Sequence, residues 1–278
     1  SSLVGFMKGS RNFPDQNEER IITAISGTTV TLDAALNYTH WGSGNEKAEV
    51  GLLTRNILVR GAPTSVTNGF GGHLMLRNVV QAQIQGVEFQ FMGQQGVLGR
   101  YPVHFHMMGN KIGQNVFLKD SSIHDCFQRC VTIHNSHGIT VQNVVAFNNF
   151  GHCFFLEDGP ERVNVFDRNL GIRALPTSKE EGNQIVPSDN QPTIFWITNP
   201  NNTYTNNAAV GGSFGFWFAM PVSPTGKSQP MYSPTDSEVR PRWTPLGLFS
   251  DNVAHSAFQN GFHVDDMTKA DETLELAA

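Results

Sequence analysis

The segment "IHDCFQRCVTIHNSHGITVQNVVAFNNFGHCFF", residues 123–155, carries two sets of matching landmarks. Ile123 and Ala146 lie in similar polar-then-small strand ends, and Cys130 and Cys153 open similar apolar strands. Both pairs are separated by 23 residues. A repeat of this length, made of short strands and turns, is typical of a solenoid. With β-type segments it predicts a parallel β-helix, in which each coil lies about 4.8 Å above the last.

The rest of the chain continues this pattern of short alternating strands separated by Gly, Asn and Asp, and helical periodicity is nearly absent. Longer spacings, such as that from Ala209 to Ala254, indicate inserted loops, chiefly residues 223–245. A β-sandwich is the main alternative, but the Asn-Gly pairs at Asn68 and Asn260 form no regular series of hairpins. We therefore predict an all-β fold, a right-handed parallel β-helix with inserted loops.

The predicted organisation is one continuous helix domain over residues 61–278, with residues 1–60 as an N-terminal β segment that leads into the helix or caps it. The net charge of −5 gives no general attraction to polyanions, so nucleic acid is not an expected partner. No apolar run approaches the roughly 20 residues of a membrane span.

Three cysteines are too few for a disulfide scaffold, and their odd number leaves at least one unpaired within the chain. Cys130 and Cys153 are expected to stack as small apolar side chains in neighbouring coils. A disulfide between Cys126 and Cys130 is possible across the turn, but free thiols are the preferred interpretation.

Strand alternation predicts a histidine cluster outside the coil. With Val103, Phe105, Val131 and Ile133 pointing inward, the outward columns read His104–Thr132–Phe155 and His106–His134–Glu157, with Asp158 at the strand end. Imidazoles and a carboxylate in adjacent coils suit a divalent cation held by His104, His106, His134 and Glu157. A one-residue slip would replace Glu157 with Leu156 in this column. The alternative interpretation is histidines that merely face solvent.

Other residues near these strands are candidates for contact with a ligand. Arg100 and Arg129 flank the His-bearing strands and could recognise an anion. Trp217 is either part of the core or a platform for sugar rings. His263, in "GFHVDD", is expected on the same face further along, together with Asp265.

Several strings resemble a known family, among them "AEVGLLTRNILVRG", "YPVHFHMMG", "RCVTIHNSHGITV", "GHCFFLEDGPE" and "GFWFAMPVSPTG". In order, from about residue 22 to 265, they are similar to the cell-surface hyaluronidase family, the group of transmembrane protein 2 and the cell migration-inducing hyaluronan-binding protein. The resemblance implies a glycine-rich domain leading into a right-handed β-helix, an extracellular or cell-surface location, degradation or binding of hyaluronan, and a role for calcium. It assigns no catalytic residue here.

Three functions remain open at this stage. The preferred one is a hyaluronidase-like glycosidase acting on hyaluronan or a related acidic glycan, with Glu157 and Asp158, or Asp265 and Asp266, as the two carboxyl groups that hydrolysis needs. A uronate lyase would use a metal and a base. A non-catalytic glycan-binding module needs neither. The expected cofactor is a divalent metal: calcium by resemblance, zinc or another transition metal by the histidines.

Overall fold

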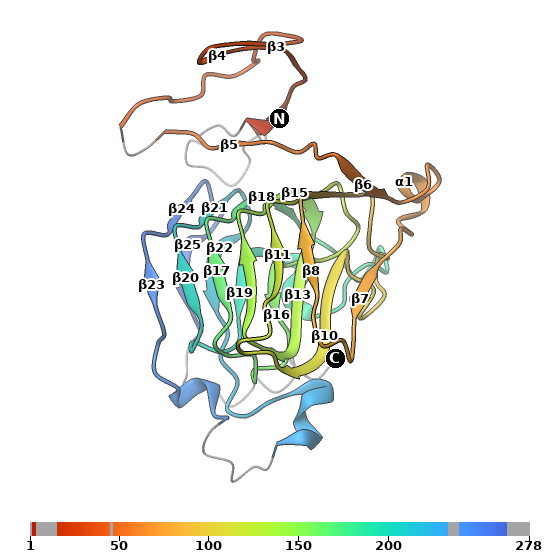
Figure 1. Ribbon diagram of the computed structural model, residues 1–278, viewed down its shortest axis with the longest axis vertical. Coiled ribbons are helices and arrows are strands. Elements are labelled where there is room, and N and C mark those ends of the chain that lie inside the picture. Colours follow the sequence, from red (N-terminus) through yellow and green to blue (C-terminus); the bar gives the residue numbers. More distant parts are fainter. Residues whose placement is uncertain (1, 4–15, 45–46, 233–238, 266–278) are drawn as a thin grey trace.

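The computed structural model describes residues 2–3, 16–44, 47–232 and 239–265. Three parallel sheets stack coil upon coil and form a parallel β-helix, as predicted (Figure 1). Sheet 1 contains β7 (Leu74–Leu76), β10 (Val103–Asn110), β13 (Val131–His137), β16 (Phe154–Leu156), β19 (Thr193–Ile197), β22 (Phe214–Phe218) and β25 (Asn260–Val264). Sheet 2 contains β8 (Gln83–Gln85), β11 (Val116–Lys119), β14 (Ile139–Gln142), β17 (Val165–Asp167), β20 (Thr203–Thr205) and β23 (Phe249–Ser250). Sheet 3 contains β6 (Ile57–Arg60), β9 (Val87–Gln90), β12 (Ser122–His124), β15 (Val145–Phe150), β18 (Leu170–Leu175), β21 (Ala208–Val210) and β24 (Val253–His255).

The remaining elements lie outside the three sheets. The N-terminal part contains β1 (Ser2–Leu3), β2 (Glu18–Glu19), β5 (Val50–Gly51) and the antiparallel hairpin of β3 (Ile22–Ser26) and β4 (Thr29–Leu32). Short helices are α1 (Ser65–Asn68), η2 (Pro187–Asn190), η3 (Gly226–Met231) and η4 (Pro241–Trp243). The hairpin stands away from the stack, whereas β6, at the end of the predicted N-terminal segment, already pairs with β9 (Figure 1). Among the described residues, no helix has the length and apolar character needed to cross a lipid bilayer.

The observed strand pairing confirms the repeat on which the fold prediction rests. Ile123 pairs with Ala146 in sheet 3. Ala209 pairs with Ala254 despite the longer spacing between them, because the extra residues lie in inserted loops.

The core fills the inside of the coil. Val103, Phe105, Val131 and Ile133 are all fully buried in it, as the alternation predicts. Further along sheet 1, Phe154, Phe195 and Phe216 form a continuous stack with ring centroids 4.7 Å apart at each step. Each such aromatic pair contributes about 0.5–1.5 kcal/mol beyond its buried area.

Asparagines set the corner between sheets 2 and 3. The amide oxygen of Asn252 accepts the backbone N–H of Asn207, that of Asn207 accepts the N–H of Asn169, and that of Asn169 accepts the N–H of Val144. We call Asn169, Asn207 and Asn252 the asparagine ladder. It satisfies backbone groups that a buried corner would otherwise leave without partners.

The outer face of sheet 3 is covered by the chain that leads into the helix. Leu53 packs there against Phe147, Ile172 and Val210. A Cβ on Gly51 would lie 2.6 Å from a methyl group of Val145, so the chain approaches this sheet too closely for a side chain. The outer face of sheet 3 is therefore closed to a ligand where this chain covers it.

Candidate functional site

The outward positions of sheet 1 form one continuous column through all seven strands. Strand pairing aligns them as Met75, His104, Thr132, Phe155, Trp196, Trp217 and His263. His106 pairs with His134 in the neighbouring column, as predicted. The aligned strands place Phe155 opposite Thr132 and therefore exclude the one-residue slip.

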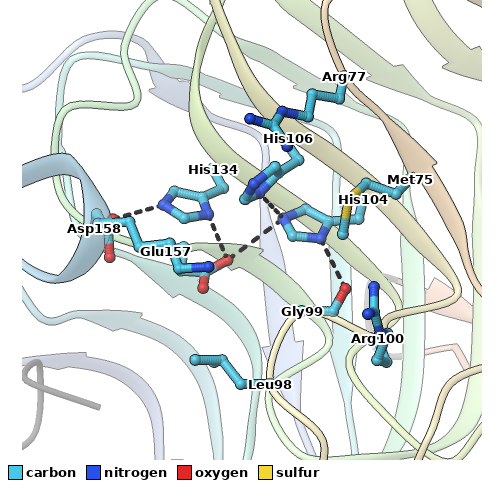
Figure 2. A pocket seen from close by; sticks show the side chains of 11 residues that line it. Met75, Arg77, Leu98, Gly99, Arg100, His104, His106, His134, Glu157 and Asp158 are labelled. Atoms are coloured by element: carbon cyan, nitrogen blue, oxygen red, sulfur yellow. Dashed lines mark hydrogen bonds and ion pairs between the residues drawn. The ribbon is translucent and has the colours of Figure 1, made fainter.

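A pocket of about 250 Å³ lies over the first coils of this column (Figure 2). Its lining residues are Met75, Arg77, Leu98, Gly99, Arg100, His104, His106, His134, Glu157, Asp158 and Lys227. They come from sheet 1, from the loop between β9 and β10, and from η3 in the inserted segment. Sheet 1 supplies the floor, and the two loops supply the walls.

His104 and His134 point away from the coil interior but are almost completely buried, because the loops cover them. The alternative of solvent-facing histidines is therefore wrong for these two residues, while His106 remains partly exposed. Outward direction in a β-helix does not by itself give contact with bulk water.

Four ligand-type side chains converge in the pocket. His104 Nε2 lies 3.3 Å from His106 Nδ1 and 3.6 Å from Glu157 Oε2, and His134 Nδ1 lies 3.3 Å from the same oxygen (Figure 2). One ring nitrogen from each of the three histidines lies within 4.8 Å of those of the other two. This brings together the four residues that the sequence predicted as metal ligands.

Neighbouring groups hold these imidazoles in place. His104 Nδ1 lies 3.1 Å from the carbonyl oxygen of Gly99, to which it donates. His134 Nε2 lies 2.6 Å from Asp158 Oδ2. The nitrogens that face Glu157 are therefore the other nitrogen of each ring, His104 Nε2 and His134 Nδ1.

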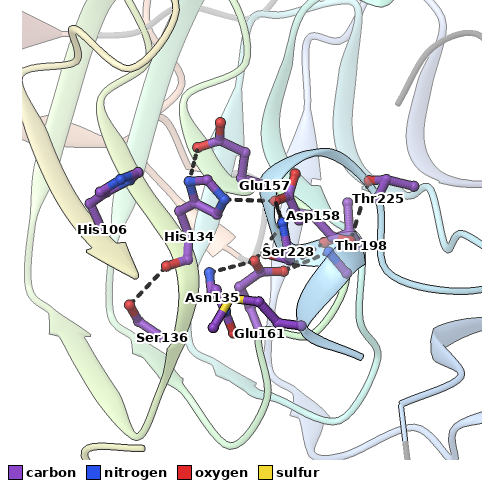
Figure 3. Close-up of polar contacts among 12 residues, drawn as sticks. His106, His134, Asn135, Ser136, Glu157, Asp158, Glu161, Thr198, Thr225 and Ser228 are labelled. Carbon is purple, nitrogen blue, oxygen red and sulfur yellow. Dashed lines mark hydrogen bonds and ion pairs between the residues drawn. The ribbon is translucent and has the colours of Figure 1, made fainter. Parts of the chain in front are cut away.

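Asp158 is itself held by the inserted segment (Figure 3). Its carboxylate accepts the backbone N–H of Ser228, and its carbonyl oxygen accepts that of Thr225. Buried Glu161 accepts the backbone N–H groups of Asn135, Asp158 and Gly159. Glu161 thus organises the turn after Glu157, a role that the sequence analysis missed because no spacing signal distinguishes it.

Burial and charge give the pocket groups different protonation behaviour. Burial lowers the pKa of His104 well below its usual value and, with the charges of His134, Lys227 and Arg77, lowers the pKa of His106 to about 4. Burial also opposes charge on His134, but the hydrogen bond to Asp158 and the charges of Glu157 and Asp158 outweigh it and raise its pKa to about 9. Burial raises the pKa of Glu157, and the charge of His134 opposes this.

Three exposed cationic side chains surround the pocket, those of Arg77, Arg100 and Lys227. Within the described part of the chain, none of them lies within 4.0 Å of a carboxylate, and Arg100 only approaches His73 at 3.3 Å. Arg100 was predicted near the His-bearing strands. Arg77 was missed, although it occupies the position directly after β7 that continues the column of His106. Lys227 was also missed, because it lies on an inserted loop outside the repeat.

Arg129 lies below the surface. It is fully buried, with Nη2 3.1 Å from Asp189 Oδ1 and its guanidinium over the Phe155 ring at 4.2 Å. The prediction that Arg129 recognises a polymer is therefore wrong for this structure, because its charge is already neutralised inside the protein.

Trp217 is also covered, in an aromatic cluster formed by Phe155, Trp196, Phe214, Trp217 and Ala219. The suggestion of an exposed platform for sugar rings is corrected accordingly. Its indole N–H donates to Asp265, whose carboxylate lies 3.4 Å from His263. Neither His263 nor Asp265 lines the pocket, and Asp266 falls outside the described residues.

Cys130 and Cys153 form a disulfide, which corrects the expectation of two stacked thiols. The aligned strands β13 and β16 bring their Cα atoms to 4.6 Å, within the range that a disulfide spans. The stacking was predicted correctly, but the bond was not. Cys126 is a buried free thiol.

Comparison with known proteins assigns the chain to a family. Residues 69–262 match the family model described as the CEMIP beta-helix. The chain belongs to the CEMIP β-helix family. The matched segment includes the whole pocket and its loops.

Three relatives illustrate the range of the family. The chain is 37% identical over 292 residues to the mouse "Cell migration-inducing and hyaluronan-binding protein", covering 90% of this chain and 21% of the relative. It is 37% identical over 260 residues to the human "Cell surface hyaluronidase CEMIP2", with 80% and 18% covered, and 34% identical over 305 residues to mouse "Fibrocystin-L", with 92% and 7% covered. The chain therefore spans about a fifth or less of these relatives' length.

Proposed function

We propose that this chain binds and cleaves hyaluronan or a related glycan of uronic acids in the pocket of sheet 1. The observation that carries the proposal is the arrangement of Arg77, Arg100 and Lys227 around one pocket without carboxylate partners among the described residues. In a chain with a net charge of −5, cations gathered at one place mark a local site for an anion.

The chemistry of the rim fits a sugar carboxylate. A guanidinium presents paired N–H donors that match the two oxygens of a carboxylate, and an ammonium adds a flexible point charge. Relatives named for hyaluronan binding and hyaluronidase activity support this class of polymer, and one named for the cell surface supports an extracellular or cell-surface setting.

For cleavage, we assign Glu157 and Asp158 to the reaction because they are the carboxylates that line the pocket. Hydrolysis of a glycosidic bond needs one group that protonates the leaving oxygen and a second carboxylate. Asp265 is not assigned, because it contacts Trp217 outside the pocket. Hydrolysis is preferred over elimination because two carboxyl groups, the pair that hydrolysis needs, line the pocket.

The test combines binding and product analysis on hyaluronan of defined size. Wild type is expected to shorten the polymer without forming the unsaturated, ultraviolet-absorbing sugar that a lyase leaves. Glu157→Gln should reduce cleavage by about 100-fold or more, since acid–base groups contribute at least that much. A product that absorbs in the ultraviolet would establish the lyase instead, and binding without cleavage would leave a glycan-binding module.

The cationic rim has its own test. Arg77→Ala combined with Lys227→Ala should weaken hyaluronan binding by about tenfold or more, because a hydrogen bond to a charged group contributes roughly 1.5–3 kcal/mol. Arg168→Ala, on the exposed turn between β17 and β18, is the matched control and should bind normally. Equal affinity in all three proteins would contradict the proposed site.

A further inference from the structure

We propose that His104, His106, His134 and Glu157 form a four-coordinate site for a transition metal of the zinc type, and not for calcium. The inference does not rest on the glycan, since metal binding can be measured without any polymer. When the ion is bound, Glu157 is one of its ligands, so its part in cleavage would be to hold the metal rather than to transfer a proton. It starts from the spacing of the donor atoms.

The separations between the donor atoms match a tetrahedron. Ligands at 2.0–2.1 Å from a tetrahedral Zn²⁺ lie about 3.3–3.4 Å from one another. His104 Nε2 to His106 Nδ1 is 3.3 Å, His134 Nδ1 to Glu157 Oε2 is 3.3 Å, and His104 Nε2 to Glu157 Oε2 is 3.6 Å. Three of the edges of such a tetrahedron are therefore already close to the required length.

Two of the four donor atoms also lack a hydrogen-bond partner among the described residues. His134 Nδ1 and Glu157 Oε2 are buried, and neither makes a hydrogen bond within the described part of the chain. Apart from their 3.3 Å ion-pair contact with one another, these two buried atoms have no hydrogen-bond partner in the ranges that the structure describes, which is costly for buried polar groups. A cation between them would satisfy both.

The surrounding groups direct the lone pairs into the same space. The Gly99 carbonyl oxygen accepts a hydrogen bond from His104 Nδ1, which leaves the lone pair of the ring on Nε2. The Asp158 carboxylate engages His134 Nε2 at 2.6 Å, which leaves Nδ1. A carboxylate or carbonyl behind each ligating histidine is the usual arrangement at protein metal sites.

The donor set does not fit calcium. Ca²⁺ takes six to eight oxygen ligands, whereas this cluster offers three imidazoles and one carboxylate. Imidazole nitrogen favours zinc and neighbouring transition metals. Calcium, if the protein needs it, would require a different place.

The decisive experiment uses the untagged chain, loaded with Zn²⁺ or Ca²⁺ and then dialysed. We expect about one Zn²⁺ per chain, removable by a chelator, and a rise in the unfolding temperature with Zn²⁺ but not with Ca²⁺. His106→Gln should lose both effects. His255→Gln, whose histidine pairs with Glu49 away from the pocket, is the control and should retain them. No bound zinc in wild type, equal zinc in His106→Gln, or stabilisation by Ca²⁺ alone would overturn the proposal.

Two further measurements keep the result independent of folding defects. Asp158→Asn should bind zinc about 10–100-fold more weakly, the usual effect of losing a group behind a ligand, and unchanged affinity would contradict its supporting role. Co²⁺ bound to wild type should give the strong visible absorption of a four-coordinate ion; a weak six-coordinate spectrum would overturn the geometry. If protons rather than a metal join these atoms, wild type will bind neither ion, while the glycan experiments remain unaffected.

Discussion

The outward column of sheet 1 has two halves with the same backbone and opposite environments. Over β7, β10 and β13 it presents Met75, His104 and Thr132 beside a pocket with unpaired cations at its rim. From β16 onward it presents Phe155, Trp196 and Trp217, which are covered and packed together. Strand position decides direction in both halves, but the covering loops decide access. We refer to them as the pocket half and the sealed half.

Charge follows the same division. In the sealed half, Arg129 is neutralised by Asp189, and His152 stacks on Trp196 with ring centroids 4.2 Å apart. In the pocket half, Arg77 and Lys227 line the pocket together with Glu157 and Asp158, but no described carboxylate oxygen lies within 4.0 Å of either cation. A buried ion pair cannot lose one partner without a large cost in stability, whereas exposed cations without an ion pair are available to a ligand.

Removing the charge partner in the sealed half should have the largest effect on stability. Asp189→Ala leaves the Arg129 guanidinium buried without its carboxylate, which costs about 3–5 kcal/mol. Denaturant unfolding of the variant beside wild type measures this. A loss below about 1 kcal/mol would mean that the two halves do not differ in the way described.

Removing the disulfide that joins the two halves should have the second-largest effect on stability. The disulfide joins β13 to β16, and the two cysteines are 23 residues apart. A Cys130→Ala, Cys153→Ala double variant should lose about 3 kcal/mol, the chain-entropy value for a loop of this size. Unfolding under non-reducing conditions is the measurement, with Cys126→Ala as the control that keeps the bond. Equal stability of wild type and double variant would show that strand pairing alone holds β13 and β16 together.

Acid should act on the sealed half through His152. Burial lowers its pKa to about 3, with Asp189 opposing and Arg129 adding to the shift. His152 therefore takes up a proton near pH 6.5 in the unfolded chain but stays neutral in the folded chain down to about pH 3. Its contribution to the free energy of unfolding is fully present above about pH 6.5 and is lost as the pH drops toward 3. Between these two pH values the contribution changes by about 1.4 kcal/mol per pH unit.

This acid dependence is tested by its slope. His152→Gln should show a shallower fall in unfolding free energy between pH 6.5 and 4 than wild type, whatever its stability at neutral pH. Parallel slopes would indicate that His152 is protonated in the folded protein and that the sealed half admits water.

The smallest effect on stability is expected in the pocket half. Arg77→Ala and Lys227→Ala should each change the free energy of unfolding by less than about 0.5 kcal/mol, since both side chains are exposed and make no described ion pair. Thermal unfolding checks this. A loss above 1 kcal/mol would make these residues structural and would weaken the contrast on which the glycan proposal rests.

Periodicity explains why so much of the fold could be predicted. The repeat from Cys130 to Cys153 sets the strand register, and strand register sets which side chains turn inward, so Val103 and Ile133 followed from the pattern alone. The same logic placed His104, His106 and His134 together. Local rules suffice wherever the coil repeats.

The rest depends on chain segments that do not repeat. Lys227 reaches the pocket on an inserted loop, and Asp189 reaches Arg129 on another, 60 residues away in sequence. No spacing predicts where such loops fold back, because tertiary contacts position them. For that reason Arg129 was interpreted as a surface charge and Trp217 as a possible sugar platform, although both are covered.

The asparagine ladder has a consequence for how this architecture can vary. Asn169, Asn207 and Asn252 bond in succession although 38 and then 45 residues separate them. Alignment of the coils from Val144 to Asn252 is thus re-established at one corner on each turn, whatever length of chain has been added at another. Loops over sheet 1 can lengthen, shorten or be exchanged without shifting the strands beneath them. A family built on this helix can alter the walls of its pocket, and with them its choice of ligand, while the imidazole floor keeps its place.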